Sequence, residues 1–340
     1  MKYLVMALLT LVSISMFAVI RTVDNNNPSA GQYDTIQAAV TAASNDDIIY
    51  VYPSNIAYAG FSVNKRLKIY GVGWNPSTSA SHHMRITTLS SQVDFAAGSE
   101  YSVLSGFYTG YYVRMHGVVG NVTIENCSMN HVHFGLSASY NASNYLIKGC
   151  RFSGGGDGGY WINNPSTQTG MTISNCIFSG TAKLMYYATS NLSVNNSYIQ
   201  TTTSVFFSHG SNPNFRNNYI IATGYTGTST FPADGVIAYN MSSTALFPSG
   251  TTNVNNIALN TAFDALYHPI PGSPVVNAGD PLADYNDLDG SRNDIGAYGG
   301  PYPFRDGGIT TLPTIRDING TYYTSPSQGI QIQIEASSEH

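Results

Sequence analysis

The sequence predicts an all-β fold, a parallel β-helix or solenoid with a short N-terminal capping helix. Three observations predict it: a short template that occurs five times, apolar residues that alternate within each copy, and an Asn or Gly corner at each end of the strand in every copy. The copies span residues 121–129, 144–152, 170–178, 191–199 and 212–220. Their second corner residues fall at positions 126, 149, 175, 196 and 217, so the interval is 21 to 26 residues, a period typical of solenoids.

The first 20 residues predict a signal peptide. Lys2 gives a short positive start, and an apolar run without charge follows from residue 4 to residue 20. An uncleaved membrane anchor is the alternative, because the run is near the lower length limit for spanning a bilayer. Cleavage would leave a chain with no membrane span, secreted or held at the cell surface.

Residues 21–70 are expected to form an N-terminal cap and the first coil. Ile36, Ala39, Val40 and Ala43 share one face of a helix whose start Asp34 or Thr35 can cap. Residues 47–53 then read as a strand. An open stack would expose its core and its edge backbone, so a cap is physically required at this end.

Residues 71–262 are expected to form the body of the β-helix. Within each copy the alternate apolar residues point inward, and the Asn or Gly corners supply the left-handed backbone that turns the chain. The corner Asn side chains are expected to hydrogen-bond to one another as a ladder. The outward residues Glu125 and Lys148 occupy the same place in adjacent coils and are expected to pair.

The three cysteines, Cys127, Cys150 and Cys176, each follow a corner residue of the template. Their equivalent places favour a buried, unpaired column, which suits small apolar thiols. One disulfide between neighbouring coils and a metal site are the alternatives. The odd number of thiols and the lack of a C-x-x-C pair count against zinc.

Residues 263–303 are expected to close the C-terminal end, and the tail 304–340 reads as a strand pair or the start of a small β module. The closing segment carries an acidic cluster that alternates around a Gly-containing turn, an arrangement that suits a structural calcium site; no other cofactor is expected. The alternative, which is favoured, is that Arg292 and loop amides satisfy the carboxylates. The cluster consists of Asp284, Asn286, Asp287, Asp289 and Asp294.

Two stretches resemble a known group of proteins. Residues 33–53, with Thr35-Ile36-Gln37, a short Ala-rich helix and a strand ending at Pro53, resemble the opening of right-handed parallel β-helix proteins of the pectate-lyase-like superfamily. Residues 272–298 resemble the C-terminal closing segment of secreted bacterial β-helix proteins. The resemblance implies a right-handed helix and export. It does not imply one activity, because the group includes lyases, hydrolases, epimerases and adhesins.

The irregular stretch 151–161 offers weak candidates for chemistry. Arg151 and Asp157 could form a catalytic pair, with a uronate carboxylate meeting Arg151 while the sugar stacks on Tyr160 or Trp161. The alternative is a loop between coils with a solvated Asp157.

Two further sets of residues could contact a ligand. Tyr198 and Tyr219 hold the same place in adjacent coils and are expected to face outward, where a glycan can stack on them or they merely cover the sheet. His131 and His133 alternate on one side of a strand, for which a structural role is favoured over ligand contact.

Composition argues against one class of binding partner, nucleic acid. Charged residues make up 10% of the chain, the net charge is −5, and the 14 Lys and Arg are scattered, so nucleic acid is not expected as a partner. The prediction is a secreted or cell-surface protein that binds a polysaccharide or cell-surface glycan, adheres or builds structure, without catalytic turnover. The alternatives are a polysaccharide lyase or related carbohydrate-active enzyme, and an extracellular fibre subunit that associates with itself.

Overall fold

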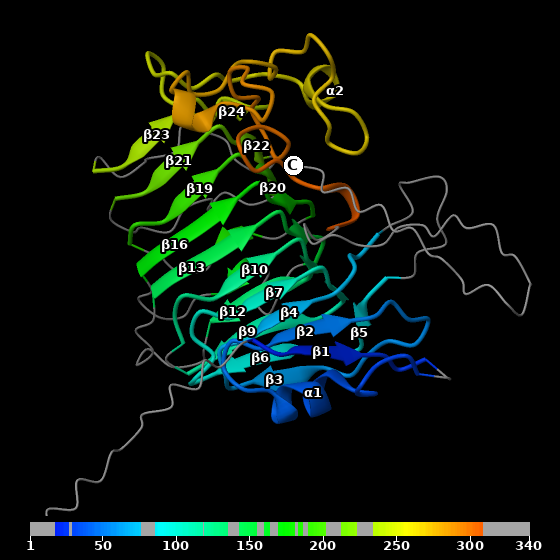
Figure 1. Cartoon of the computed structure of the whole chain (residues 1–340). Coiled ribbons are helices and arrows are strands. Elements are labelled where there is room, and N and C mark those ends of the chain that lie inside the picture. The colour runs from blue at the N-terminus through cyan, green and yellow to red at the C-terminus, as the bar shows by residue number, and fades with distance from the viewer. Residues whose placement is uncertain are drawn as a thin grey trace, which may run out of the picture.

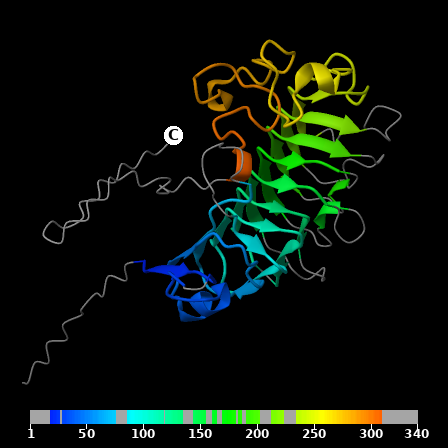
Figure 2. The same cartoon turned by 90° about the vertical axis from the view of Figure 1, so that its right-hand side faces the viewer.

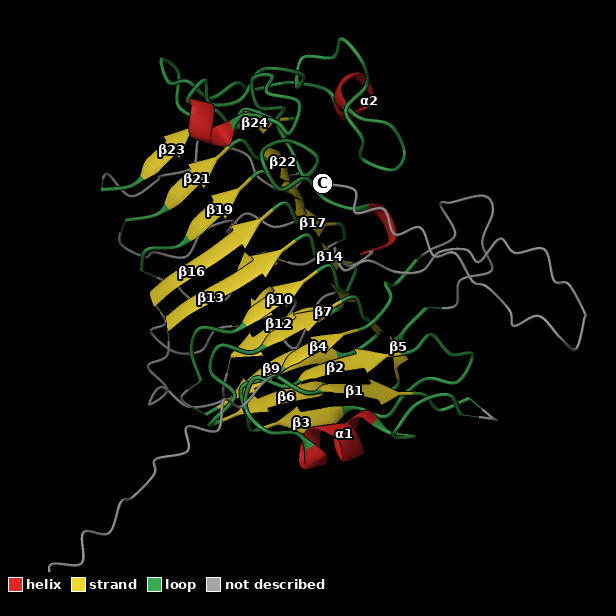
Figure 3. Cartoon of the chain, in the orientation of Figure 1, coloured by secondary structure: helices red, strands yellow, loops and turns green. Residues whose placement is uncertain are grey.

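The computed structural model describes residues 18–26, 29–75, 86–117, 119–134, 143–154, 160–163, 169–180, 183–185, 190–201, 212–222 and 234–308. These residues build a rod of stacked parallel strands, with a short helix at the N-terminal end and irregular chain at the other (Figures 1 and 3). Most of the predicted signal peptide, residues 1–17, lies outside the described residues. Among the described residues, no helix is long and apolar enough to cross a membrane.

The largest of the three sheets, which we call sheet A, has ten strands. Neighbouring strands are parallel and in register from coil to coil, as in Ile124, which lies between Leu104 and Ile147. The strands are β1 (Ile20–Val23), β2 (Ile48–Val51), β4 (Lys68–Tyr70), β7 (Val103–Ser105), β10 (Thr123–Glu125), β13 (Ser143–Lys148), β16 (Thr169–Ser174), β19 (Ser193–Asn195), β21 (Asn214–Arg216) and β23 (Val236–Ala238).

Sheets B and C form the other two faces of the rod (Figure 2). In the middle of the rod each coil adds one strand to A, then one to B, then one to C. Sheet B contains β5 (Thr88–Leu89), β8 (Tyr108–Thr109), β11 (Ser128–Met129), β14 (Arg151–Phe152), β17 (Ile177–Phe178), β20 (Tyr198–Thr201), β22 (Tyr219–Ala222) and β24 (Met241–Ser242). Sheet C contains β3 (Phe61–Val63), β6 (Val93–Ala96), β9 (Tyr112–His116), β12 (His131–Phe134), β15 (Tyr160–Asn163) and β18 (Lys183–Met185). The predicted parallel β-helix is therefore confirmed.

The corners of the template have the left-handed backbone that the sequence predicts. The φ angles of all ten corner residues lie between 46° and 70°. Asn and Gly tolerate this conformation at the lowest cost, which explains why they recur there. The first corners are Asn121, Asn144, Gly170, Asn191 and Asn212, and the second corners, between sheets A and B, are Asn126, Gly149, Asn175, Asn196 and Asn217.

Inward side chains from the three sheets fill the rod with one continuous apolar core, and the three thiols belong to it. Cys127, Cys150 and Cys176 are buried and unpaired, as predicted, so the disulfide alternative is wrong. Burial, only partly offset by backbone amides, raises the pKa of Cys127 to about 12. Burial and the neighbouring thiol of Cys176 likewise raise the pKa of Cys150. Cys127 and Cys150 therefore pack as thiols and not as thiolates.

The N-terminal cap forms as the sequence predicts. Helix α1 (Ile36–Ala42) begins after Thr35, whose hydroxyl accepts a hydrogen bond from the Ala38 amide. At its other end the Lys65 ammonium donates to the carbonyls of Val40 and Ala43 at 3.1 and 2.7 Å. Lys65 therefore compensates carbonyls that a helix end leaves without partners.

The closing segment does more than cover the end of the rod. After α2 (Leu259–Ala262) the chain crosses the last coil and then runs back along the corner between sheets A and B, as the orange trace in Figure 1 shows. It includes two short 3₁₀ turns, η2 (Ala283–Tyr285) and η3 (Asp306–Gly308). Packed chain continues past residue 303, because the Phe304 amide donates to Ala297, and Gly307 accepts from the Trp74 amide. The closing segment is therefore described as residues 263–308; residues 309–340 of the predicted tail lie outside the described residues.

Three of the second-corner Asn residues, Asn175, Asn196 and Asn217, bind this segment. The Asn175 side-chain amide donates to the carbonyls of Ala297 and Gly299 at 3.0 and 2.7 Å. The Asn217 side chain accepts from the Asp280 amide at 2.7 Å. Asn217 also reaches Asn196 at 3.4 Å, so part of the expected Asn ladder exists. The main partners nevertheless belong to the closing segment, which corrects the expectation that the Asn residues chiefly bond to one another.

Candidate functional site

Arg151 lies on the outer face of sheet B, in β14, and its guanidinium carbon is 5.6 Å from the centre of the Trp74 ring. Tyr160 and Trp161 belong to β15, which is a strand of sheet C. The structure thus places Arg151 and this aromatic pair on different faces of the rod. Asp157 lies outside the described residues. The predicted pairing of Arg151 with Asp157 stays a prediction.

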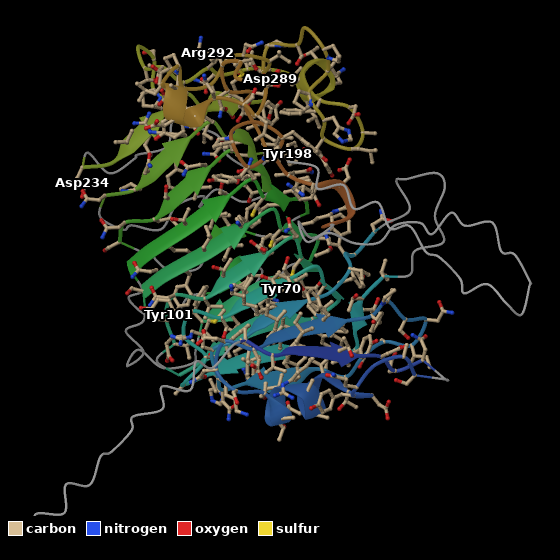
Figure 4. All side chains as sticks on the ribbon, viewed as in Figure 1. Tyr70, Tyr101, Tyr198, Asp234, Asp289 and Arg292 are labelled. Carbon is tan, nitrogen blue, oxygen red and sulfur yellow. The ribbon has the colours of Figure 1, made fainter. Side chains whose placement is uncertain are left out.

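Tyr198 and Tyr219 do not face solvent as expected. Both rings are fully buried, stacked at 5.9 Å between centres, and covered by residues of the closing segment. Phe263 lies 5.8 Å from Tyr198 and 4.8 Å from Tyr219, and Tyr267 lies 4.4 Å from Tyr198. Figure 4 shows Tyr198 at the border between the rod and the closing segment. The predicted exposure to solvent is wrong, because a segment far along the chain covers this outer face.

The acidic cluster of the closing segment, near the labels Asp289 and Arg292 in Figure 4, is held by its own loop. The Asp287 carboxylate accepts hydrogen bonds from the amides of Asp294 and Gly300, and the Asp294 carboxylate accepts from Asn277. Burial raises the pKa of Asp287 and of Asp294 despite these donors.

Of the other three residues of the cluster, two have partners elsewhere in the loop and one is exposed. Asp289 accepts from Ser291, the Asn286 amide donates to the carbonyl of Gly290, and Asp284 is exposed. Among the described residues, no group of three or more His, Cys, Asp or Glu side chains is arranged to hold a metal ion. The structural calcium site stays a prediction. Loop amides satisfy Asp287 and Asp294 as the alternative predicted, but Arg292 instead donates to the carbonyls of Gly279 and Ala278.

The closing segment also contains a histidine held between two carboxylates. His268 is 3.1 Å from Asp264 through Nδ1 and 2.9 Å from Asp306 through Nε2. The Tyr298 hydroxyl donates to the other oxygen of Asp306 at 2.6 Å, and its ring is 4.4 Å from the imidazole. We call these four residues the His268 clamp. It ties residue 306, near Trp74, to the chain that follows α2.

The clamp predicts a pH dependence of stability. Desolvation opposes the charged imidazole, but hydrogen bonds to Asp306 and Asp264 outweigh it and raise the pKa of His268. A raised folded-state pKa stabilises the protein fully below the unfolded value, about 6.5, and that contribution is lost as pH rises through the folded pKa. His268→Gln should therefore lower the Tm most in mildly acidic buffer, and the difference from wild type should shrink above neutrality. Thermal melts across pH would check this, with the exposed His116→Gln as control; a difference independent of pH would contradict it.

A second cluster lies on the outer face of sheet C and combines residues of three consecutive coils. Asp94, Arg114 and His133 are directly in register on β6, β9 and β12. Arg114 donates to both oxygens of Asp94 at 2.7 and 2.9 Å. Tyr112 is aligned with His131, and its ring lies 5.0 Å from His131 and 6.0 Å from His133.

Most of this sheet C cluster was not predicted. His131 and His133 are only 6% and 7% exposed, which agrees with the structural role favoured for them, although they also adjoin Tyr112 and the ion pair. The available signal was the spacing of Asp94, Arg114 and His133, which are about one coil apart. That signal falls outside the template, so it becomes visible only when the register of sheet C is known.

A family model for the right-handed beta helix region matches residues 91–262, just over half of the chain. The chain belongs to the right-handed β-helix family. The predicted right-handed parallel β-helix is thereby confirmed, and the sheet C cluster lies within the matched region. This β-helix protein is similar to the crystal structure of pectate lyase Pel9A over 84% of its own chain and 97% of that chain, with 12% sequence identity and a TM-score of 0.38. No curated protein matches it.

Proposed function

We propose that this β-helix protein is secreted or displayed at the cell surface, where it binds carbohydrate without turning it over, through the outer face of sheet C. The observation that carries the proposal is the half-buried Tyr112 ring beside the Arg114–Asp94 pair, with the buried His131 and His133 packed against that ring. An aromatic ring next to fixed donors and acceptors suits a sugar, which offers an apolar ring face and hydroxyls at its rim.

The same coil extends the aromatic surface toward sheet B. Tyr111 is 46% exposed and directly precedes Tyr112, and Tyr108 on β8 is also exposed. The Arg114 guanidinium carbon lies 5.9 Å from the Tyr112 ring centre, which restricts the orientation of that ring. Because coils repeat about every 4.8 Å along the rod, a glycan chain lying across them can meet several such groups.

The arrangement favours recognition over proton transfer. The carboxylate of the cluster, Asp94, has both oxygens engaged by Arg114, and a general base must be able to accept a proton from its substrate. A bidentate pair instead holds both side chains in a fixed geometry, which lowers the entropy cost of binding.

Affinity electrophoresis in gels that contain uronate or neutral polysaccharides would test the proposal. We expect retardation by at least one polymer, and about tenfold weaker binding for Tyr111→Ala and for Tyr112→Ala, equivalent to roughly 1.4 kcal/mol. Tyr302→Ala is the matched control, because Tyr302 is 70% exposed but lies against Lys148 of sheet A. Equal mobility of all variants, or no retardation by any polymer, would count against a glycan site on sheet C.

Two assays on the same protein address the alternatives. Formation of unsaturated uronate products that disappears in Arg151→Ala would replace this proposal with a polysaccharide lyase. Negative-stain images of long fibres at increasing protein concentration would favour a self-assembling subunit. Short single rods without product formation agree with the proposal.

A further inference from the structure

Two buried hydrogen-bond donors face the same seam between sheet B and the closing segment. Among the described residues, neither Trp74 Nε1 nor Arg151 Nε has a hydrogen-bond partner. Trp74 is only 9% exposed, and the Arg151 guanidinium carbon lies 5.6 Å from its ring centre. Buried donors are nearly always paired in folded proteins, because each unpaired one costs about 1–3 kcal/mol. Two of them close together indicate an acceptor that none of the described residues supplies.

The surroundings explain why no side chain takes that place. Trp74 is held under the closing segment by its backbone bond to Gly307 and by Phe304, whose ring centre is 6.3 Å away. Along the outer face of sheet B, Arg151 has Ser128 and Ile177 as neighbours. Neither neighbour carries a charge.

The carboxylates on the closing-segment side are already engaged. Asp306 accepts from Tyr298 and contacts His268, and Asp264 contacts the other nitrogen of the same imidazole. No described carboxylate forms an ion pair with Arg151. The Arg151 charge interacts electrostatically with Tyr298, without a hydrogen bond between the two side chains among the contacts of the described residues. The seam therefore holds a guanidinium cation and an indole N–H. Among the described residues, neither Arg151 Nε nor Trp74 Nε1 has a hydrogen-bond acceptor.

We propose that Arg151 and Trp74 form a binding site for an oxyanion, a carboxylate or sulfate group such as those of acidic sugars. Both side chains are donors only, so they select an acceptor, and the guanidinium charge selects an anionic one. This site lies on sheet B and does not depend on the proposed glycan site on sheet C.

The indole proton of Trp74 is a direct reporter. The chain has two tryptophans, so ¹H–¹⁵N spectra contain two indole signals, and Trp161→Phe assigns them. Titration with sodium acetate, sodium glucuronate and sodium sulfate, against chloride at constant ionic strength, should shift the Trp74 signal to saturation with a Kd of about 1 mM or lower for at least one anion. Saturation by acetate and glucuronate identifies a carboxylate site, and saturation by sulfate alone identifies a sulfate site.

Variants separate this site from general charge effects. Arg151→Gln should abolish the saturable shift, and Trp74→Phe should abolish the rise in Tm that the bound anion causes. Lys148→Gln is the matched control, because it removes one positive charge from the neighbouring strand of sheet A in the same coil and should leave the affinity unchanged. A linear shift without saturation, equal affinity in Arg151→Gln, or no response to any of the three anions would overturn the proposal.

Discussion

Replacing Asn175 by alanine is expected to lower the free energy of unfolding by about 3–5 kcal/mol. The Asn175 amide holds the carbonyls of Ala297 and Gly299, and its backbone φ is 52°. Alanine would leave two buried carbonyls without this donor and would place a Cβ-bearing residue that lacks the local stabilisation of Asn in a left-handed conformation. Urea unfolding, read as a lower midpoint at constant m, would measure the loss.

Two control variants separate these causes. Asn175→Gly keeps the left-handed backbone and removes only the amide, so it should cost about 1–2 kcal/mol less than alanine. Asn144→Ala changes an exposed first-corner residue with a φ of 62° in the neighbouring strand β13, and should show the backbone cost alone. Equal losses for Asn175→Ala and Asn144→Ala would mean that the amide bonds to the closing segment contribute nothing.

Arg216→Ala is expected to cost about 3–5 kcal/mol, because it leaves a buried carboxylate without its cation. Arg216 on β21 pairs with Asp280, which is 1% exposed, and its guanidinium carbon lies 5.5 Å from the ring centre of Tyr285. Asp280 also accepts from the Leu282 amide at 3.1 Å. The pair therefore joins the rod to the closing segment at a point where the Asp280 carboxylate is almost fully buried.

A double-mutant cycle would isolate this interaction. Arg216→Met combined with Asp280→Asn should cost less than the sum of the two single changes, because no buried charge remains. Arg66→Ala is the matched control: Arg66 pairs with Asp46 at the surface, where solvent screens the interaction, so its loss should cost far less than the loss of Arg216. Additive effects of Arg216 and Asp280 would contradict a coupled buried pair.

The repeat was predictable because its information is local. Alternation of apolar residues fixes which side chains face the core, and an Asn or Gly corner needs no distant partner to favour a positive φ. The cysteine column and the pair of Glu125 with Lys148, which are 3.0 Å apart, follow from the one-coil period. The capping helix behind Thr35 follows from its own helical spacing of apolar residues and from its N-cap.

Contacts between the rod and the closing segment were not predictable in the same way. Tyr198 and Tyr219 have the outward parity of exposed residues, and nothing within their own coils indicates that Phe263 and Tyr267 cover them. Arg151 likewise has no local sign of its neighbour Trp74, which lies more than seventy residues earlier in the chain. The sheet C cluster depends on the register of coils whose connecting stretches differ in length.

The sequence by itself determined the coil: its period, its corners, its inward residues and the cap at its N-terminal end. These features depend on backbone preference and on alternation within a few residues, which act before any distant contact forms. Only the tertiary structure decided which outer faces are open. A closing segment that returns along the second corners buries the aromatic row of sheet B, binds the corner Asn residues and creates the seam at Arg151. That choice rests on pairings between chain segments up to about two hundred residues apart, which no local pattern encodes.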